Sequence, residues 1–359
     1  MTTLALEPQL LSLTLCDPAR AVAYDKTQWE RLVWQSRAAE LMAQLHLVLS
    51  EASVLASAPA PARRHLEIAS VIARRHADAV RHELGNLRRT LEPLQVPVVL
   101  LKGAAYLAMG HDAARGRIFN DVDILVPKTA LKGVEQRLNW DGGFPLHTTA
   151  YDERYYRDWM HEIPPLQHKN RATVLDVHHT ILPPTSGYRI DADALLERCR
   201  RLDRDPACFA VLAPEDMVVH SACHLFFGEF HKGLRDLYDL HQLLSGFSED
   251  AGFWAQLVER ATSLGLARPV LDALEQSQRL FRTRIPQHVE RDLRPAATSI
   301  WPGVCRRWLF DHALRPPHAS AGGRMTAFGR WLAFVRSHWL RMPLPLLAYH
   351  LSYKALLAR

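Results

Sequence analysis

The sequence predicts an α+β fold in which a small mixed β-sheet lies between a helical N-terminal layer and a helical C-terminal region. Three short runs rich in apolar and β-branched residues, at 96–101, 118–126 and 173–179, predict the strands. Apolar residues recur at helical spacing through most of the chain before residue 92 and after residue 190. The apolar and charged fractions, 48% and 23% of 359 residues, are those of an ordinary globular protein.

The N-terminal layer, residues 1–95, is expected to be helical after a less periodic start. Residues 28–50 show a helical pattern. A longer amphipathic helix is predicted from about residue 64 to residue 92, because its apolar residues fall on one helical face. Pro93 and Pro97 end it, since proline cannot continue a helix.

The sheet is expected within residues 96–190. The pattern predicts, in order, a strand (96–101), a short helix from Gly103 to Gly110, a strand (118–126), a helix (about 128–140) and a strand (173–179). Residues 141–172 are rich in aromatics but fit no regular period, so we expect a hairpin or a lid there.

Helices are expected almost without interruption after residue 190. We expect this part to consist of a helical domain, 191–314, and a basic helical tail, 315–359. The tail begins with the Pro- and Gly-rich segment 315–324, which predicts a flexible joint. The predicted helices cover about 191–200, 214–227, 233–246, 252–264, 267–282, 301–313, 325–341 and 343–357.

The positive charge of the chain is concentrated near its C-terminal end. Residues 301–359 hold nine Lys and Arg against one acid, Asp311, and account for the net charge of +6. A basic tail predicts an anionic partner, although a solvated helix face explains it equally simply. Tryptophans lie among the arginines, and Trp331, Phe334 and Trp339 share one helix face, which favours packing into the core.

The sequence favours a cytoplasmic protein. Its first residues lack the basic start and cleavage site of a signal peptide, and no apolar run is long enough to predict a transmembrane segment. The five cysteines are scattered and form no CxxC motif, so we expect reduced thiols.

Two carboxylates lie at the start of the second predicted strand. Asp121 and Asp123 are two residues apart, so their side chains point to the same face of the strand. Carboxylates placed side by side repel each other, and such pairs commonly hold a divalent cation. Asp176, in the third strand, is a third acid in a similar setting. We therefore expect Asp121, Asp123 and Asp176 to bind Mg²⁺ or Mn²⁺ for phosphoryl chemistry.

Residues upstream of this acid pair could bind a nucleoside triphosphate (NTP). Gly103 lies where the first strand turns into a helix, and a small residue there lets backbone N–H groups approach phosphates. Lys102 and Arg117 could neutralise phosphate charge, and His178 shares the strand face of Asp176. Alternatively, Lys102 is a surface residue at a turn, Arg117 forms a structural ion pair and His178 supports an acid.

The spacing of these residues resembles the uncharacterised nucleotidyltransferase family of the DNA polymerase β-like superfamily. The similarity is carried by LKGAAYLAMG, by Arg117 followed by Asp121-x-Asp123 in an apolar strand, and by the later LDVHH. It implies a nucleotidyltransferase α/β core in which Asp121, Asp123 and Asp176 bind metal and Gly103 holds phosphates. The wider superfamily usually has Gly-Ser after its first strand, whereas here Lys102 precedes Gly103 and Ala104 follows it.

The reaction expected from this resemblance is transfer of a nucleoside monophosphate from an NTP to a hydroxyl or phosphate acceptor, with release of pyrophosphate. The acceptor could be a sugar, a modified peptide, a protein or an RNA end. Two alternatives stay open: a metal-dependent glycosyltransferase, because D-x-D also binds nucleotide-sugars, and a non-catalytic nucleotide-binding or scaffold protein.

Overall fold

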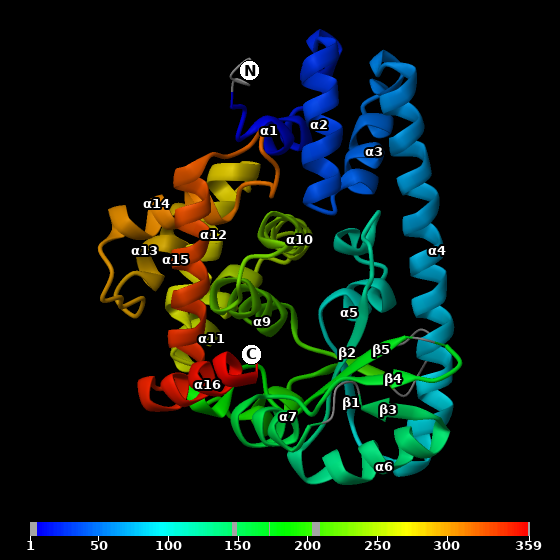
Figure 1. The fold of residues 1–359 in the computed structure, drawn as a ribbon, viewed down its shortest axis with the longest axis vertical. Coiled ribbons are helices and arrows are strands. Elements are labelled where there is room, and N and C mark those ends of the chain that lie inside the picture. The colour runs from blue at the N-terminus through cyan, green and yellow to red at the C-terminus, as the bar shows by residue number, and fades with distance from the viewer. Residues whose placement is uncertain (1–5, 146–148, 172, 203–208, 358–359) are drawn as a thin grey trace.

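The computed structural model describes residues 6–145, 149–171, 173–202 and 209–357. It confirms the α+β class: a mixed sheet lies at one end of the molecule, and helices form the rest (Figure 1). Within the described residues, no helix is long and apolar enough to cross a membrane.

Among the described residues, the sheet has seven short strands in the order β3-β4-β5-β2-β1-β7-β6. Two pairs are parallel, β2 with β5 and β1 with β7, and the other neighbours are antiparallel. The strands are β1 (Val98–Leu100), β2 (Asp121–Leu125), β3 (Gly143–Pro145), β4 (Leu166–His168), β5 (Val174–His178), β6 (Arg200–Arg201) and β7 (Phe209–Val211).

The sheet extends beyond residue 190, the limit expected for the α/β core. β7 is a buried three-residue strand that pairs with β1, and β6 adds an edge beside it. So short a strand leaves almost no periodic signal in the sequence, and its position becomes clear only from its pairing with β1.

Four helices form the N-terminal layer: α1 (Leu10–Cys16), α2 (Lys26–Ala38), α3 (Met42–Glu51) and α4 (Ala60–Leu91). The helical pattern expected over 28–50 is present as two helices, α2 and α3, and Glu40 between them adopts a left-handed backbone with φ of 56°. Its carboxylate lies 2.6 Å from Arg235 and 3.1 Å from Lys232. These tertiary ion pairs hold the turn, and nothing in the local sequence indicates them.

The long helix α4 runs from this layer along the molecule to the sheet (Figure 1). The core helices are α5 (Lys102–Met109), α6 (Leu131–Asp141) and α7 (Ala150–Arg154), which continues as a π-helical turn, Tyr155–Trp159. The segment predicted as a hairpin or lid therefore holds β3, α7, the π-helical turn and β4.

The C-terminal region contains α8 (Ala192–Glu197), α9 (Pro214–Phe227), α10 (Gly233–Phe247), α11 (Phe253–Ser263), α12 (Ala267–Phe281), α13 (Gln287–Leu293), α14 (Gly303–Ala313), α15 (Arg324–Arg341) and α16 (Leu344–Leu357). α9 is buried along almost its whole length and contacts α10, α11, α12 and α15. One continuous hydrophobic core joins helices α8 through α15 with the sheet and the N-terminal layer, whereas α16 packs against α7 in a separate cluster.

The segment predicted as a flexible joint instead packs against the N-terminal layer. Ser320 accepts hydrogen bonds from the backbone N–H of Glu7 (2.9 Å, to its carbonyl oxygen) and from the side chain of Gln35 (3.0 Å, to its hydroxyl), and Ala321 is fully buried. Contacts with Glu7 and Gln35, far away in the sequence, fix this segment, although its composition is that of a linker.

The expectation that the aromatic face of α15 is buried is wrong. Trp331, Phe334 and Trp339 are 57%, 41% and 44% exposed. The buried face of this helix consists of small residues: Thr326, Gly329, Ala333 and Ser337. A Cβ atom on Gly329 would lie 2.6 Å from the Cβ of His312, so only small residues allow α15 to approach α14 this closely.

The half-buried His241 predicts an acid-sensitive fold. Its Nδ1 lies 2.8 Å from the Thr283 hydroxyl and its ring stacks on Phe281, and burial lowers its pKa from 6.5 to about 4. The unfolded chain therefore binds more protons than the folded chain between these values, so stability should fall as the pH drops from about 6.5 towards 4.

For His241→Gln, we expect the loss of unfolding free energy between pH 7 and pH 5 to shrink by about 2 kcal/mol relative to the parent. Urea titrations at the two pH values measure this difference. The exposed His288, changed to Gln, is the control and should keep the parent's pH dependence. If the unfolding free energy of the parent and of His241→Gln falls equally between pH 7 and pH 5, the role given to His241 is contradicted.

Candidate functional site

The site is built around a strained turn between β1 and α5. Lys102, the first residue of α5, has a φ of 45°, a left-handed conformation that costs free energy for a residue with a Cβ. The preceding Leu101 donates its N–H to the backbone carbonyl of Asp123, at 3.0 Å. This turn directs the Lys102 ammonium to Asp123 Oδ1, at 2.6 Å.

The sheet register brings the predicted acids together. β2 and β5 are adjacent and parallel, with Asp123 opposite Asp176 and Asp121 opposite Val174. Because side chains alternate along a strand, Asp121 and Asp123 share one face of β2, and Asp176 and His178 share one face of β5. Asp121, Asp176, His178 and Lys102 all line the same cleft.

Asp123 is the most deeply buried of these acids, with 2% of its surface exposed. It accepts hydrogen bonds from Lys102 and from His178 Nε2, the latter at 3.1 Å. Burial alone would raise its pKa, but the Lys102 charge and the His178 hydrogen bond outweigh burial and hold the pKa well below its usual range. Asp123 is therefore ionised at neutral pH.

Asp176 and Asp121 are crowded by burial and by neighbouring acids, which disfavours their ionised forms. Burial, followed by the charges of Asp123 and Glu162, raises the pKa of Asp176 to about 8. Burial and the charge of Asp123 also raise the pKa of Asp121. Asp176 Oδ1 is buried without a hydrogen-bond partner in the described structure. Crowded carboxylates with an orphaned oxygen fit a divalent cation, which prefers oxygen ligands.

A fourth carboxylate, Glu162, joins this cluster and was missed in the sequence. It follows the π-helical turn and forms an antiparallel bridge with His178. Its Oε2 lies 3.5 Å from His178 Nε2. The acid lies in the aperiodic segment 141–172, where the only local signal is the His161–Glu162 pair just before two prolines.

His178 is almost completely buried between these acids. Burial alone would lower its pKa, but the hydrogen bond with Asp123 and the charge of Glu162 outweigh burial and raise it. The prediction that His178 shares the acid-bearing face of β5 agrees with its hydrogen bond to Asp123.

Gly103 and Arg117 lie together at the side of the acids. Arg117 is 6% exposed, and its Nε donates to Asp239 Oδ2 in α10, at 2.9 Å. A Cβ atom on Gly103 would lie 2.1 Å from one guanidinium nitrogen of Arg117. Glycine is therefore needed here to admit the Arg117 side chain, which reaches the cleft while paired with Asp239.

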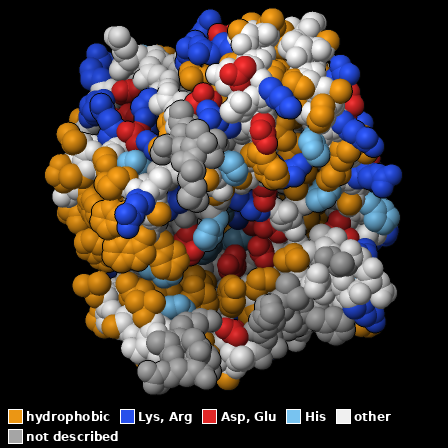
Figure 2. Space-filling model, turned by 45° about the horizontal axis from the view of Figure 1, so that its top comes forward, with side chains coloured by type: hydrophobic (Ala, Val, Ile, Leu, Met, Phe, Trp, Pro, Cys, Tyr) orange, Lys and Arg blue, Asp and Glu red, His pale blue; other side chains and the backbone are white. Residues whose placement is uncertain are grey.

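The cleft over these residues has a volume of about 480 Å³. Figure 2 shows acidic and histidine side chains gathered in a hollow on this face. The far wall comes from α9 and α10 and includes His220, His224, Lys232, Arg235 and Asp236. Burial, and then the nearby charge of Lys102, lowers the pKa of His220 to about 3, so this histidine is neutral.

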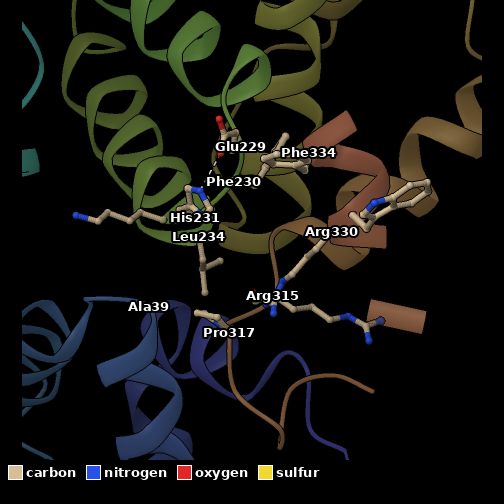
Figure 3. A pocket seen from close by; sticks show the side chains of 12 residues that line it. Ala39, Glu229, Phe230, His231, Leu234, Arg315, Pro317, Arg330 and Phe334 are labelled. Atoms are coloured by element: carbon tan, nitrogen blue, oxygen red, sulfur yellow. Dashed lines mark hydrogen bonds and ion pairs between the residues drawn. The ribbon is translucent and has the colours of Figure 1, made fainter. Parts of the chain in front are cut away.

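A second pocket, of about 390 Å³, adjoins the cleft (Figure 3). The connection between α9 and α10 separates the two, since Glu229, Phe230, His231 and Lys232 line both. The opposite wall of the second pocket comes from α15 and the segment before it, with Arg315, Arg330, Trp331 and Phe334.

Comparison with known families agrees with the geometry. Residues 25–282 match the model of a family described as uncharacterised nucleotidyltransferase. The match spans well over half of the chain, so the protein belongs to this family of nucleotidyltransferases. This confirms the resemblance seen in the sequence motifs. No match was found among curated proteins.

The contact between Gly103 and Arg117 can be tested through stability. We expect Gly103→Ala to lower the unfolding free energy by about 1–3 kcal/mol, because the added methyl group overlaps the guanidinium and forces the buried pair with Asp239 to shift. Urea denaturation measures the change.

The matched control is Gly85→Ala in α4, where an added Cβ meets no atom within 4 Å. That substitution should raise stability by about 0.5–1 kcal/mol, because alanine favours a helix over glycine. If the two variants change stability in the same direction, the packing role of Gly103 is refuted.

Proposed function

We propose that the protein transfers a nucleoside monophosphate from an NTP to a hydroxyl or phosphate acceptor, with release of pyrophosphate. The observation that carries the proposal is the pairing of Asp123 with Asp176 across β2 and β5, beside Asp121 and below the Lys102 turn. Family membership supports the reaction class.

In this proposal, Asp121, Asp123 and Asp176 hold Mg²⁺ or Mn²⁺. A cation bound there would neutralise triphosphate charge and lower the pKa of an acceptor hydroxyl. The surrounding residues prepare these ligands: Lys102 keeps Asp123 ionised, and the His178 hydrogen bond fixes the orientation of its carboxylate. Asp176 has an oxygen without a partner in the described structure, so it can bind a second cation or accept the proton of the attacking hydroxyl.

The triphosphate would lie at the start of α5, where Lys102, Gly103, Arg117 and His178 meet. The N-terminus of a helix favours anions, and Lys102 and Arg117 add positive charge at the cleft. The acceptor would then enter along the α9–α10 wall. The cleft leaves space on that side, and its polar lining suits an acceptor with hydroxyl or phosphate groups.

The function can be tested by following pyrophosphate release with each NTP and Mg²⁺, with and without candidate acceptors. Asp123→Asn should reduce turnover by at least about 10²–10³-fold, because the variant loses the charge that Lys102 and a cation share. Asp193→Asn, at an exposed acid in α8, should retain the parent's rate.

Other outcomes separate the alternatives. Turnover with a nucleotide-sugar and not with an NTP would indicate a glycosyltransferase. NTP binding without turnover under any condition would indicate a nucleotide-binding or scaffold protein. Pyrophosphate release by Asp123→Asn at the parent's rate would overturn the role assigned to this residue.

We also propose that the exposed side of α15 binds an anionic lipid surface. The apolar side chains exposed there are Met325, Phe328, Trp331, Phe334, Val335 and Trp339. Figure 2 shows hydrophobic side chains gathered on the side of the molecule that α15 occupies. Residues 301–359 contain nine Lys and Arg and one acid, Asp311. Two of these arginines pair with acids elsewhere, Arg306 with Asp272 and Arg341 with Glu229, and the others leave the segment basic. Aromatic and aliphatic groups next to arginines match the boundary between lipid headgroups and acyl chains.

Sedimentation with phosphatidylcholine vesicles containing phosphatidylserine tests this contact. We expect binding that weakens with added salt and falls at least about tenfold in the double variant Trp331→Ser, Trp339→Ser. The control is Trp140→Ser, which removes an 81% exposed tryptophan from α6. Binding to single-stranded RNA instead of vesicles, or equal vesicle binding by the double variant, would refute the lipid assignment.

A further inference from the structure

Three side chains at the floor of the cleft have the composition of a transition-metal site. His161, Glu162 and His178 each offer one ligand atom, and these atoms lie within 4.8 Å of one another. The ring centroids of His161 and His178 are 5.1 Å apart. Two imidazoles and one carboxylate form a ligand set that binds divalent first-row metals.

Backbone hydrogen bonds hold the two segments that carry these side chains. Ile163 donates its N–H to Val177, at 3.1 Å, and His179 donates to His161, at 2.9 Å. Glu162 and His178 face each other in an antiparallel bridge. The ligands are therefore fixed by the sheet, as a preorganised metal site requires.

The imidazoles have coordination capacity that the surrounding protein does not use. In the described structure, Nδ1 of His161 and Nδ1 of His178 are buried without a hydrogen-bond partner. A buried polar atom left unpaired destabilises the folded protein, and a bound ion would offset that cost. His178 also donates through Nε2 to Asp123. Histidines that bind metals commonly make such a hydrogen bond to a carboxylate through their other nitrogen.

The ligand types in the cleft suit two kinds of cation. The carboxylates of Asp121, Asp123 and Glu162 lie close enough to the Lys102 ammonium to act on its charge, and Asp176 is next to them. The three aspartates offer only oxygen, which suits Mg²⁺, whereas the histidines offer nitrogen, which Mg²⁺ binds poorly.

We propose that His161, Glu162 and His178 form a second cation site, selective for a transition metal such as Mn²⁺, Co²⁺ or Zn²⁺ over Mg²⁺. The site lies next to the three aspartates and is linked to them by the hydrogen bond between His178 and Asp123. It binds its ion without nucleotide or acceptor, so this inference does not depend on the proposed transfer reaction.

Cobalt titration of the full-length, chelator-treated protein tests the site, because Co²⁺ bound through nitrogen gives visible absorption bands. With a large excess of Mg²⁺ present to occupy the three aspartates, we expect one equivalent of Co²⁺ to bind and the Mg²⁺ not to displace it. Affinity should fall at least about tenfold in His161→Gln and in Glu162→Gln. Circular dichroism and urea unfolding show whether each variant folds. If one of the two fails to fold, the Co²⁺ affinity of the other decides the test.

The matched control is His224→Gln, which lines the same cleft but lies outside the cluster. It should bind Co²⁺ as the parent does. The proposal is overturned if the parent takes up no Co²⁺, if Mg²⁺ displaces it readily, or if His161→Gln and Glu162→Gln bind as tightly as the parent.

Asp121→Asn separates this inference from the transfer reaction, since Asp121 is not one of the three ligands. We expect this variant to lose turnover and to keep Co²⁺ binding. Retained turnover would count against the proposed reaction alone, whereas loss of Co²⁺ binding would count against the separate cation site.

Discussion

The buried ion pair between Lys102 and Asp123 is the interaction on which the rest of the site depends. A carboxylate that is 2% exposed cannot stay ionised without a partner, and the ammonium 2.6 Å away supplies one. The ammonium reaches this position only because Lys102 adopts a left-handed backbone at the end of β1. Backbone strain at one residue is thus stabilised by a charge interaction inside the sheet, as at many functional sites.

Around this pair, neighbouring strands and helices position the other charged side chains of the site. β5 brings Asp176 opposite Asp123, and the segment after the π-helical turn adds Glu162 next to His178. On the other side, the ion pair between Arg117 and Asp239 joins α10 to the start of α5, through the space left by Gly103. The acids are therefore crowded by a sheet and two helices that cannot move apart without exposing buried charge.

Much of this arrangement could be predicted from the sequence, for definite reasons. Asp121, Asp123 and Asp176 interrupt apolar strands, and strand alternation fixes the face on which each side chain lies. Their convergence also requires the pairing of β2 with β5. Glu162 and the ion pair of Arg117 with Asp239 could not be predicted in the same way. The first lies in an aperiodic segment, and the second joins residues more than 100 positions apart. Tertiary packing also determines which face of α15 is buried, because its small residues and not its aromatic ones face the core.

The pairing of β7 with β1 has a consequence for how the protein can be divided. Residues 96–190 read as a self-contained α/β unit, yet Val98, Val99 and Leu100 find their parallel partners at Phe209, Ala210 and Val211. A fragment ending at residue 190 would leave that side of β1 unpaired and apolar. Open edges of this kind recruit other chains. The excised unit would self-associate, so the smallest soluble fragment retaining the acids has to continue past β7.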